Sequence, residues 1–193
     1  MSIDFYNENA DSFVQGTLNV DMQSLYNPFI LKLRKNALIL DAGCGSGRDS
    51  KAFMDMGYRV EAIDASKAMV EHASAYSGLN VRHLTFQQID AFNKYDAIWS
   101  CASLLHVSLS ELPEVVAKLS RSLKSHGIWY LSFKYGDSER IKDGRTFTDL
   151  DENGLQTLIA AQRDVEIVET WVTKDARPAR AEKWLNAILR KVD

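Results

Sequence analysis

The sequence predicts an α/β fold, a doubly wound parallel sheet with helices on both faces. Short apolar runs of strand length alternate with amphipathic stretches of helix length, which is the pattern of such a fold. The first run, Ala37 to Leu40, leads into a glycine-rich loop and then a short helical pattern. A strand, a glycine loop and a helix in this order bind nucleotide-like ligands at the carboxyl end of the strand.

The composition is that of an ordinary globular protein. The chain has 193 residues and a net charge of −3, with no basic cluster that would favour nucleic acid. No apolar run approaches the roughly 20 residues that a membrane helix needs, and the acidic N-terminus does not resemble a signal peptide. We therefore expect one domain over residues 1–193, in a cytoplasmic monomer or homodimer that acts on a small molecule.

The two cysteines, Cys44 and Cys101, fall in predicted core segments and form no Cys-x-x-Cys motif. We expect both to be reduced thiols. The four histidines show no spacing typical of metal ligands, so the sequence predicts no metal site.

A helical region precedes the first strand, from residue 4 to about residue 34. Two apolar stripes with helical spacing support it, and Tyr6 belongs to the first stripe. Pro28 falls within the second stripe, where it should bend the helix.

Three glycines occupy alternate positions in the loop after the first strand: Gly43, Gly45 and Gly47. The spacing does not fit a dinucleotide fingerprint or a phosphate-binding loop, because both motifs require a glycine where this chain has Arg48. Asp41 comes just before the loop. A carboxylate on the lip of the loop would repel a pyrophosphate and favour a cation such as an ammonium or a sulfonium.

The second predicted strand, residues 58–63, ends at Asp64. An acidic residue at this place in a doubly wound sheet accepts hydrogen bonds from ribose hydroxyls. The alternative is a carboxylate that only caps a turn. Ser66 should cap the following helix, and Glu61 should lie on the other side of the strand in solvent or in an ion pair.

Further apolar runs predict strands at residues 80–85, 96–101, 128–133 and 165–173. One helix should follow a cap at Ser110, and another should begin at Thr148 or Asp149. We expect the polar segments 137–148 and 174–180 to be loops, both of them basic. The first could be a solvated linker or a flap that binds an anion.

The glycine loop resembles motif I of the class I S-adenosylmethionine (SAM) methyltransferases, through the string LDAGCGSG at Leu40 to Gly47. EAIDASKAMVEHA resembles the family's segment after the second strand. YDAIWSCASLLHV resembles its fourth-strand motif, particularly that of the branch of tellurite-resistance methyltransferases. The resemblance implies a Rossmann-like sheet of seven mostly parallel strands with an antiparallel last strand. On this ground we expect residues 182–192 to form that strand, although their apolar spacing is helical.

SAM is the cofactor that the resemblance implies, and residues 1–34 would form a helical cap over its site. The binding residues implied in this way are Asp41, Ala42, Gly43, Cys44, Gly45, Gly47, Asp64, Ala65, Phe86, Gln87, Ser100 and Cys101. Gln87 or Gln88 stands where many relatives carry an aspartate, and a glutamine amide can still accept from the adenine amino group.

Two residues are candidates for catalysis, and each has a structural alternative. His106 follows the fourth strand and could act as a general base or bind substrate, or it could merely begin a helix. Tyr6 could close over the ligand or be a packing aromatic. Arg48, Lys134 and Arg145 could bind an anionic acceptor such as a tellurium or selenium oxyanion, which needs cations rather than a base.

Two other functions remain open. A NAD(P)-dependent oxidoreductase could share this architecture, although Asp41 and Arg48 count against it. A regulatory module that binds SAM without turnover would keep the same loop. A shared fold does not choose between these functions.

Overall fold

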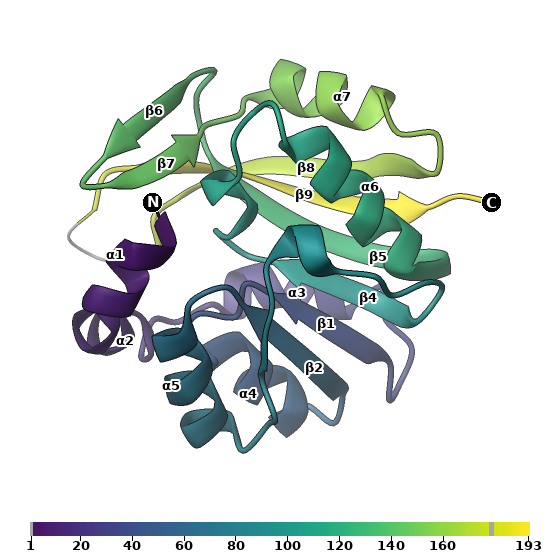
Figure 1. Cartoon of the computed structure of the whole chain (residues 1–193). Coiled ribbons are helices and arrows are strands. Elements are labelled where there is room, and N and C mark those ends of the chain that lie inside the picture. Colours follow the sequence, from purple (N-terminus) through teal and green to yellow (C-terminus); the bar gives the residue numbers. More distant parts are fainter. Residues whose placement is uncertain (1, 178–179) are drawn as a thin grey trace.

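The computed structural model describes residues 2–177 and 180–193, and Figure 1 shows a twisted sheet with helices in front of it and behind it. In the described part of the chain the main sheet has seven strands in the order β3-β2-β1-β4-β5-β9-β8. The bounds are β1 Leu38–Ala42, β2 Arg59–Asp64, β3 Arg82–His83, β4 Tyr95–Ser100, β5 Leu123–Lys134, β8 Val165–Lys174 and β9 Lys183–Lys191. Strands β1 to β5 pair in parallel, and β9 pairs antiparallel with both β5 and β8. The predicted sheet is confirmed.

Helices cover both faces of this sheet. They are α1 Ser2–Glu8, α2 Ala10–Thr17, α3 Gln23–Ile30, α4 Arg48–Asp55, α5 Lys67–Ser77, α6 Leu112–Ser122 and α7 Glu152–Ala160, with 3-10 turns η1 Phe86–Gln88 and η2 Leu104–His106. Helices α6 and α7 share one apolar core with one face of the sheet, whereas α3 and α4 share a second core with the opposite face. None of the helices described is long and apolar enough to cross a membrane.

The last segment is a strand, as the family resemblance implied. β9 lies between β5 and β8, so both of its edges are paired. Its residues from Leu185 to Leu189 are all buried. A strand that is buried on both sides loses the alternation of apolar and polar residues, which explains why the spacing suggested a helix.

Residues 137–148 are not a loop, contrary to the prediction. They contain a hairpin of β6 Glu139–Lys142 and β7 Arg145–Thr148. Asp143 and Gly144 at its turn have φ angles of +51° and +71°, as a two-residue hairpin turn requires. The Asp-Gly pair was the available sequence signal. The hairpin stands beside α1 at one edge of the molecule (Figure 1).

The predicted starts of α6 and α7 are both wrong. Glu111, not Ser110, precedes α6, and the Ser110 hydroxyl instead lies 3.2 Å from that of Ser108. Asp151 caps α7 by accepting from the Gly154 amide at 2.7 Å. Thr148 and Asp149 do not begin that helix: the Thr148 hydroxyl donates to the Val107 carbonyl, and Asp149 pairs with Arg140.

The N-terminal region is helical as predicted, but it divides into α1, α2 and α3, with Pro28 inside α3. The third predicted strand shrinks to the two residues of β3. Ser66 does cap α5, and Glu61 does form ion pairs, with Lys94 and Arg82. The predicted loop 174–180 includes Pro178 and Ala179, which lie outside the described residues.

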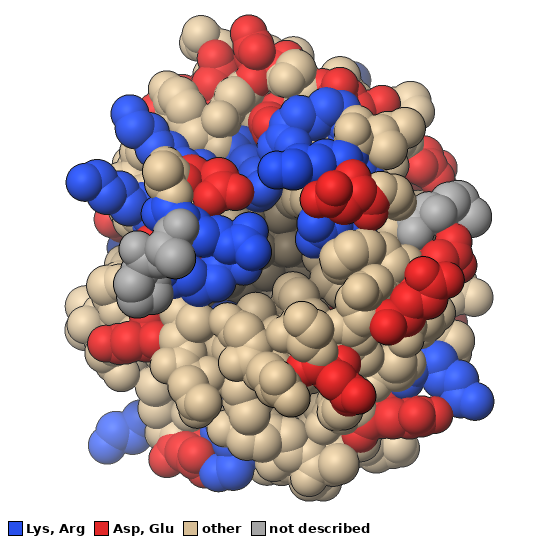
Figure 2. Space-filling model, turned by 90° about the vertical axis from the view of Figure 1, so that its left-hand side faces the viewer, with Lys and Arg blue, Asp and Glu red and all other residues tan. Residues whose placement is uncertain are grey.

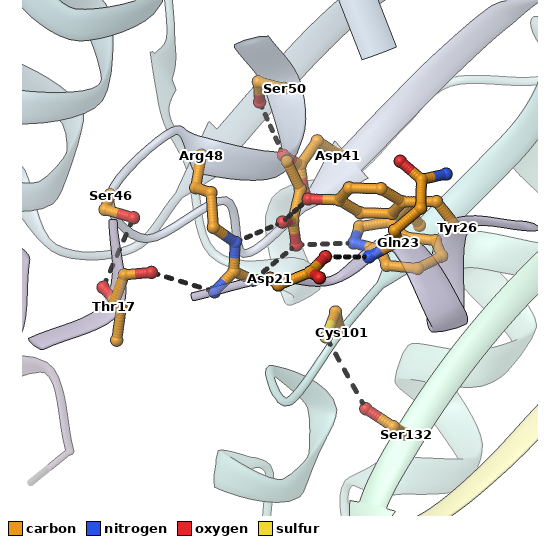
Figure 3. Close-up of polar contacts among 12 residues, drawn as sticks. Thr17, Asp21, Gln23, Tyr26, Asp41, Ser46, Arg48, Ser50, Cys101 and Ser132 are labelled. Atoms are coloured by element: carbon orange, nitrogen blue, oxygen red, sulfur yellow. Dashed lines mark hydrogen bonds and ion pairs between the residues drawn. The ribbon is translucent and has the colours of Figure 1, made fainter. Parts of the chain in front are cut away.

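A buried carboxylate joins the elements behind the glycine loop. Asp49 of α4 accepts from the Tyr26 hydroxyl at 2.5 Å and from Trp99 Nε1 at 2.8 Å. The Arg48 guanidinium donates to the same carboxylate at 2.6 and 3.0 Å and to the Thr17 carbonyl at 3.1 Å, as Figure 3 shows for the contacts around Arg48 and Tyr26. Burial opposes the charge of Asp49, but the adjacent Arg48 and the donated hydrogen bonds outweigh it and keep the pKa of Asp49 below its usual value.

The substitution Asp49→Asn should lower the free energy of unfolding by about 3–5 kcal/mol, because it leaves the Arg48 guanidinium partly buried without its counter-charge. Asp55→Asn on the same helix is the matched control. Asp55 pairs with Lys51 on the exposed side of α4, so its loss should cost less than about 1 kcal/mol. Urea denaturation of both variants measures the difference, and equal losses would contradict the structural role given to Asp49.

Candidate active site

The glycine loop begins where β1 ends and lies against the segment that follows β4. Gly43 has a φ of +81°, and a Cβ atom there would lie 2.5 Å from Cβ of Ser103 and 3.2 Å from the ring of Phe86. The Ser103 hydroxyl donates to the Ala42 carbonyl at 2.7 Å and fixes this approach. Position 43 therefore requires glycine, and the bare backbone faces the space beside Phe86.

Asp64 connects the end of β2 with the loop. Its two carboxylate oxygens accept from the Gly45 amide at 2.9 Å and from the Ser66 amide at 2.8 Å. Burial raises the pKa of Asp64, and these amide hydrogen bonds oppose the increase. Each carboxylate oxygen has more than one acceptor site, so Asp64 can bind the loop and still accept from a ligand hydroxyl.

Asp41 and Gly47 flank the loop and are not among the residues that line the cavity, so their contact with a cofactor stays a prediction. Asp41 is buried beneath the loop, where it accepts from the Ser50 hydroxyl at 2.5 Å. Burial raises the pKa of Asp41, and the nearby charge of Asp49 raises it further. Gly47 packs on α5, since a Cβ atom there would lie 2.9 Å from Cα of Ala73. Both residues shape the loop from behind.

Ala42, Ser100 and Gln87 are also not among the residues that line the cavity, so their contact with a cofactor stays a prediction. Ala42 and Ser100 end their strands with fully buried side chains, and the Ser100 hydroxyl accepts from Trp129 Nε1 at 3.0 Å. The Gln87 amide is directed toward α6, where its Nε2 donates to Glu111 at 3.3 Å. The register of the paired strands and the short turn η1 determine these orientations. The sequence alone indicated neither the register nor the turn.

A cavity of about 710 Å³ opens at the carboxyl ends of the parallel strands. Residues of α1 and α2 line it as well as the sheet edge. The predicted residues that do line it are Gly43, Cys44, Gly45, Asp64, Ala65, Phe86 and Cys101 from the β1, β2 and β4 side, with Tyr6, Arg48, His106, Lys134 and Arg145. Its volume falls in the range of small-molecule and cofactor sites.

Tyr6 and His106 meet in this cavity although they are far apart in the sequence. The Tyr6 hydroxyl lies 2.8 Å from His106 Nε2, and His106 Nδ1 lies 2.8 Å from the Thr146 carbonyl oxygen. A carbonyl only accepts, so the proton of the neutral imidazole is on Nδ1 and Nε2 accepts from Tyr6. Burial lowers the pKa of His106 to about 4, with a further contribution from the charges of Arg145 and Lys134.

The three predicted anion-binding residues differ in what they contact. The Arg48 guanidinium already binds Asp49 and the Thr17 carbonyl within the protein, and its role in substrate binding stays a prediction. Lys134 lies 3.5 Å from Glu182 and 4.5 Å from the centre of the Phe147 ring. Lys134 and Arg145 therefore remain at the cavity wall, near His106.

Several contributors to the site carried no clear sequence signal. Phe13 of α2 faces the loop, because a Cβ atom on Gly45 would lie 3.3 Å from its ring. Ser103 supports Gly43, and Thr146 contributes only its backbone carbonyl to His106. Ala102, which also lines the cavity, has a φ of +52°, a strained conformation for a residue with a Cβ atom.

The cysteines are free thiols, as expected. Cys101 lies at the base of the cavity, and burial raises its pKa to about 12, so it is a neutral thiol at physiological pH. Within residues 2–177 and 180–193 no group of three or more histidine, cysteine, aspartate or glutamate side chains could hold a metal ion.

Known proteins match both the sequence and the fold. Residues 39–127 match the methyltransferase domain family. Over 99 residues the chain is 29% identical to a ubiquinone biosynthesis O-methyltransferase of Rickettsia conorii, a match that covers 49% of this chain and 34% of that protein. The chain thus spans about a third of the length of this curated relative.

Solved structures share the fold over nearly the whole chain. The structure of 1,6-didemethyltoxoflavin-N1-methyltransferase of Burkholderia thailandensis, with 1,6-didemethyltoxoflavin and S-adenosylhomocysteine bound, superposes with a TM-score of 0.77 and 22% identity over 99% of this chain and 85% of that one. The [4+2]-cyclase SpnF superposes with a TM-score of 0.76 and 16% identity over 98% of this chain and 94% of that one. Residues 39–127 thus resemble a methyltransferase domain, and the strand order and the glycine loop agree with that resemblance.

Proposed function

We propose that this protein transfers a methyl group from SAM to a hydroxyl group of a small acceptor, and that His106 and Tyr6 take up the proton that the acceptor loses. The observation that carries the proposal is the 2.8 Å contact between Tyr6 and His106 Nε2. It lies in the same cavity as the glycine loop and Asp64. The name of the Rickettsia relative, an O-methyltransferase, supports oxygen as the acceptor atom.

The residues at the loop end of the cavity fit SAM. The bare backbone of Gly43 would hold the amino-acid end of SAM, and the neighbouring Phe86 ring would cover one face of the adenine. Asp64 would accept hydrogen bonds from the ribose hydroxyls. When bound, SAM supplies a methyl group that a positively charged sulfur has already activated. The chain has to orient the acceptor, exclude water and accept a proton. Helices α1 and α2 line the cavity, and we propose that they cover the bound cofactor.

The proton would move along the Tyr6–His106 pair. The Thr146 carbonyl keeps the imidazole proton on Nδ1, so the Nε2 lone pair is free to accept. The acceptor hydroxyl would donate to the Tyr6 oxygen while Tyr6 passes its own proton to Nε2. Burial raises the pKa of Tyr6 itself, so Tyr6 would act as a relay and His106 as the final base.

Two alternatives lose support at this site. A NAD(P)-dependent oxidoreductase would need a glycine at position 48, whereas Arg48 binds Asp49 there. A SAM-binding module without turnover would have no use for a buried neutral base beside the cofactor space. The likeness to a [4+2]-cyclase is a reason to test the reaction directly, because the fold by itself does not define the chemistry.

A metalloid oxyanion such as tellurite, the acceptor of the branch suggested by the sequence, is a second candidate. Lysine and arginine side chains at the cavity mouth favour an anion (Figure 2). Such an acceptor brings its own lone pair and needs no base, so loss of the Tyr6–His106 pair would leave its methylation intact.

Asp64→Asn should weaken SAM binding by about tenfold or more, because it removes a charge-assisted hydrogen bond to the ribose. Glu61→Gln is the matched control, since Glu61 lies on the same strand but pairs with Lys94 away from the cavity. Calorimetric titration with SAM measures both affinities. Unchanged binding by Asp64→Asn would contradict the ribose assignment.

His106→Asn and Tyr6→Phe should each reduce kcat by about 10²–10⁴-fold, because each interrupts the same proton path. His126→Asn is the control: His126 lies near the start of β5 with an exposed side chain and a φ of +60°, which asparagine tolerates. Single-turnover methylation of small hydroxylated compounds measures the effect. Full activity of both site variants would point to an acceptor that needs no base.

The pH dependence should follow the low pKa of His106. Since the base must be unprotonated, kcat/KM should stay constant from neutral pH downward and fall only as pH drops through about 4. An unperturbed histidine would instead lose activity near pH about 6.5. A limb near that higher value in the measured profile would contradict the geometry assigned to His106.

A further inference from the structure

Resting on the proposed methyl transfer, we propose that the acceptor also carries an anionic group, a carboxylate or a group of similar charge. This group would bind Lys134 and Arg145 and offset the positive charge around His106. The acceptor would thus have one charged end that is recognised and one hydroxyl that reacts.

The ring of Phe147 brings these groups together. Lys134 Nζ lies 4.5 Å from its centroid, the Arg145 guanidinium carbon 5.1 Å, and the His106 ring centroid 5.0 Å. The base and the two cations therefore surround one aromatic side chain, within the length of a small molecule. The Arg145 guanidinium is also held over the ring of Phe5, at 4.0 Å.

The two cations have bonding capacity to spare. Lys134 lies 3.5 Å from Glu182, and the same carboxylate also pairs with Arg180 at 3.8 Å. Arg145 lies 3.6 Å from Asp143 at the exposed hairpin turn. Arg145 Nε is buried and is the side-chain donor that lacks a hydrogen-bond acceptor in the described part of the chain. Leaving a buried donor unpaired costs free energy, which a bound carboxylate would recover.

Positive charge dominates the mouth of the cavity. Figure 2 shows blue side chains around a hollow, with fewer red ones between them. The basic residues lining the cavity at this end are Lys134, Lys142, Arg145, Lys174, Arg177 and Arg180, whereas the acidic ones are Asp143, Asp175 and Glu182. A cleft with such an excess attracts small anions.

The same charges act on His106. Of the described titratable groups, Tyr6 from α1 contacts its ring, and Lys134 from β5 and Arg145 from β7 lie at the Phe147 ring, which His106 also contacts. None of these is acidic, and both cations disfavour a proton on His106. A carboxylate bound between them would offset their charge and make Nε2 a better base. Anionic acceptors would therefore be favoured both in binding and in proton transfer.

The test is an NMR titration of His106 in the full chain labelled with ¹⁵N, with and without S-adenosylhomocysteine. His106→Asn identifies the signal among the four histidines. Benzoate, inorganic phosphate and the neutral benzamide serve as probes at equal concentration. We expect at least one anion to raise the pKa of His106 by about one unit, whereas benzamide leaves it unchanged. A response to benzoate indicates a carboxylate acceptor, and a response to phosphate alone indicates a phosphate-like one.

Two variants locate the effect. Lys134→Met and Arg145→Met keep long apolar side chains but lose the charge, so each should reduce the response to the anion and weaken its binding by about tenfold. Lys51→Met, on the exposed side of α4 and away from the cavity, should respond like the unaltered protein. No response to either anion, or a full response in both cavity variants, would overturn the inference. Failure of S-adenosylhomocysteine to bind would instead count against the methyl transfer.

Discussion

The buried carboxylate of Asp49 holds together the elements that shape the glycine loop. It binds α3 through Tyr26, β4 through Trp99 and the end of α2 through Arg48. A buried charge is tolerated here because every one of these donors is directed at it. With α4 fixed in this way, the loop cannot move away from the end of β2, and Asp64 meets the Gly45 amide at 2.9 Å.

The two halves of the site come from different strands of the sheet. β1 and β2 supply bare backbone and a carboxylate, which suit a nucleoside-containing cofactor, whereas β5 and the hairpin supply cations. Between them lies His106, whose tautomer is set by the backbone of β7 and whose Nε2 accepts from α1. The chemistry that we propose therefore requires contacts between α1, the turn η2 that follows β4, and the β6–β7 hairpin. These elements are distant in the sequence.

This distance explains what the sequence could and could not predict. The glycine loop and Asp64 were predicted from local motifs and their spacing, whereas Phe86 came from the family resemblance, and all three lie at the cavity. Asp41 and Gly47 were part of the same motif, yet burial and packing on α5 removed them from the cavity. The pairing of Tyr6 with His106 depends on tertiary contacts, so the sequence identified both residues but not their relation. The Asp143-Gly144 pair was a local signal for the hairpin turn. The prediction of a loop missed it because it relied on the polarity of the segment.

The most direct test of the account is a calorimetric titration of the full chain with S-adenosylhomocysteine and, in parallel, with NADH. We expect micromolar binding of S-adenosylhomocysteine and no heat from NADH, because the loop offers bare backbone and Asp64 but no third glycine for a pyrophosphate. Binding of NADH without binding of S-adenosylhomocysteine would contradict the assignment of the glycine loop, and with it the proposed reaction.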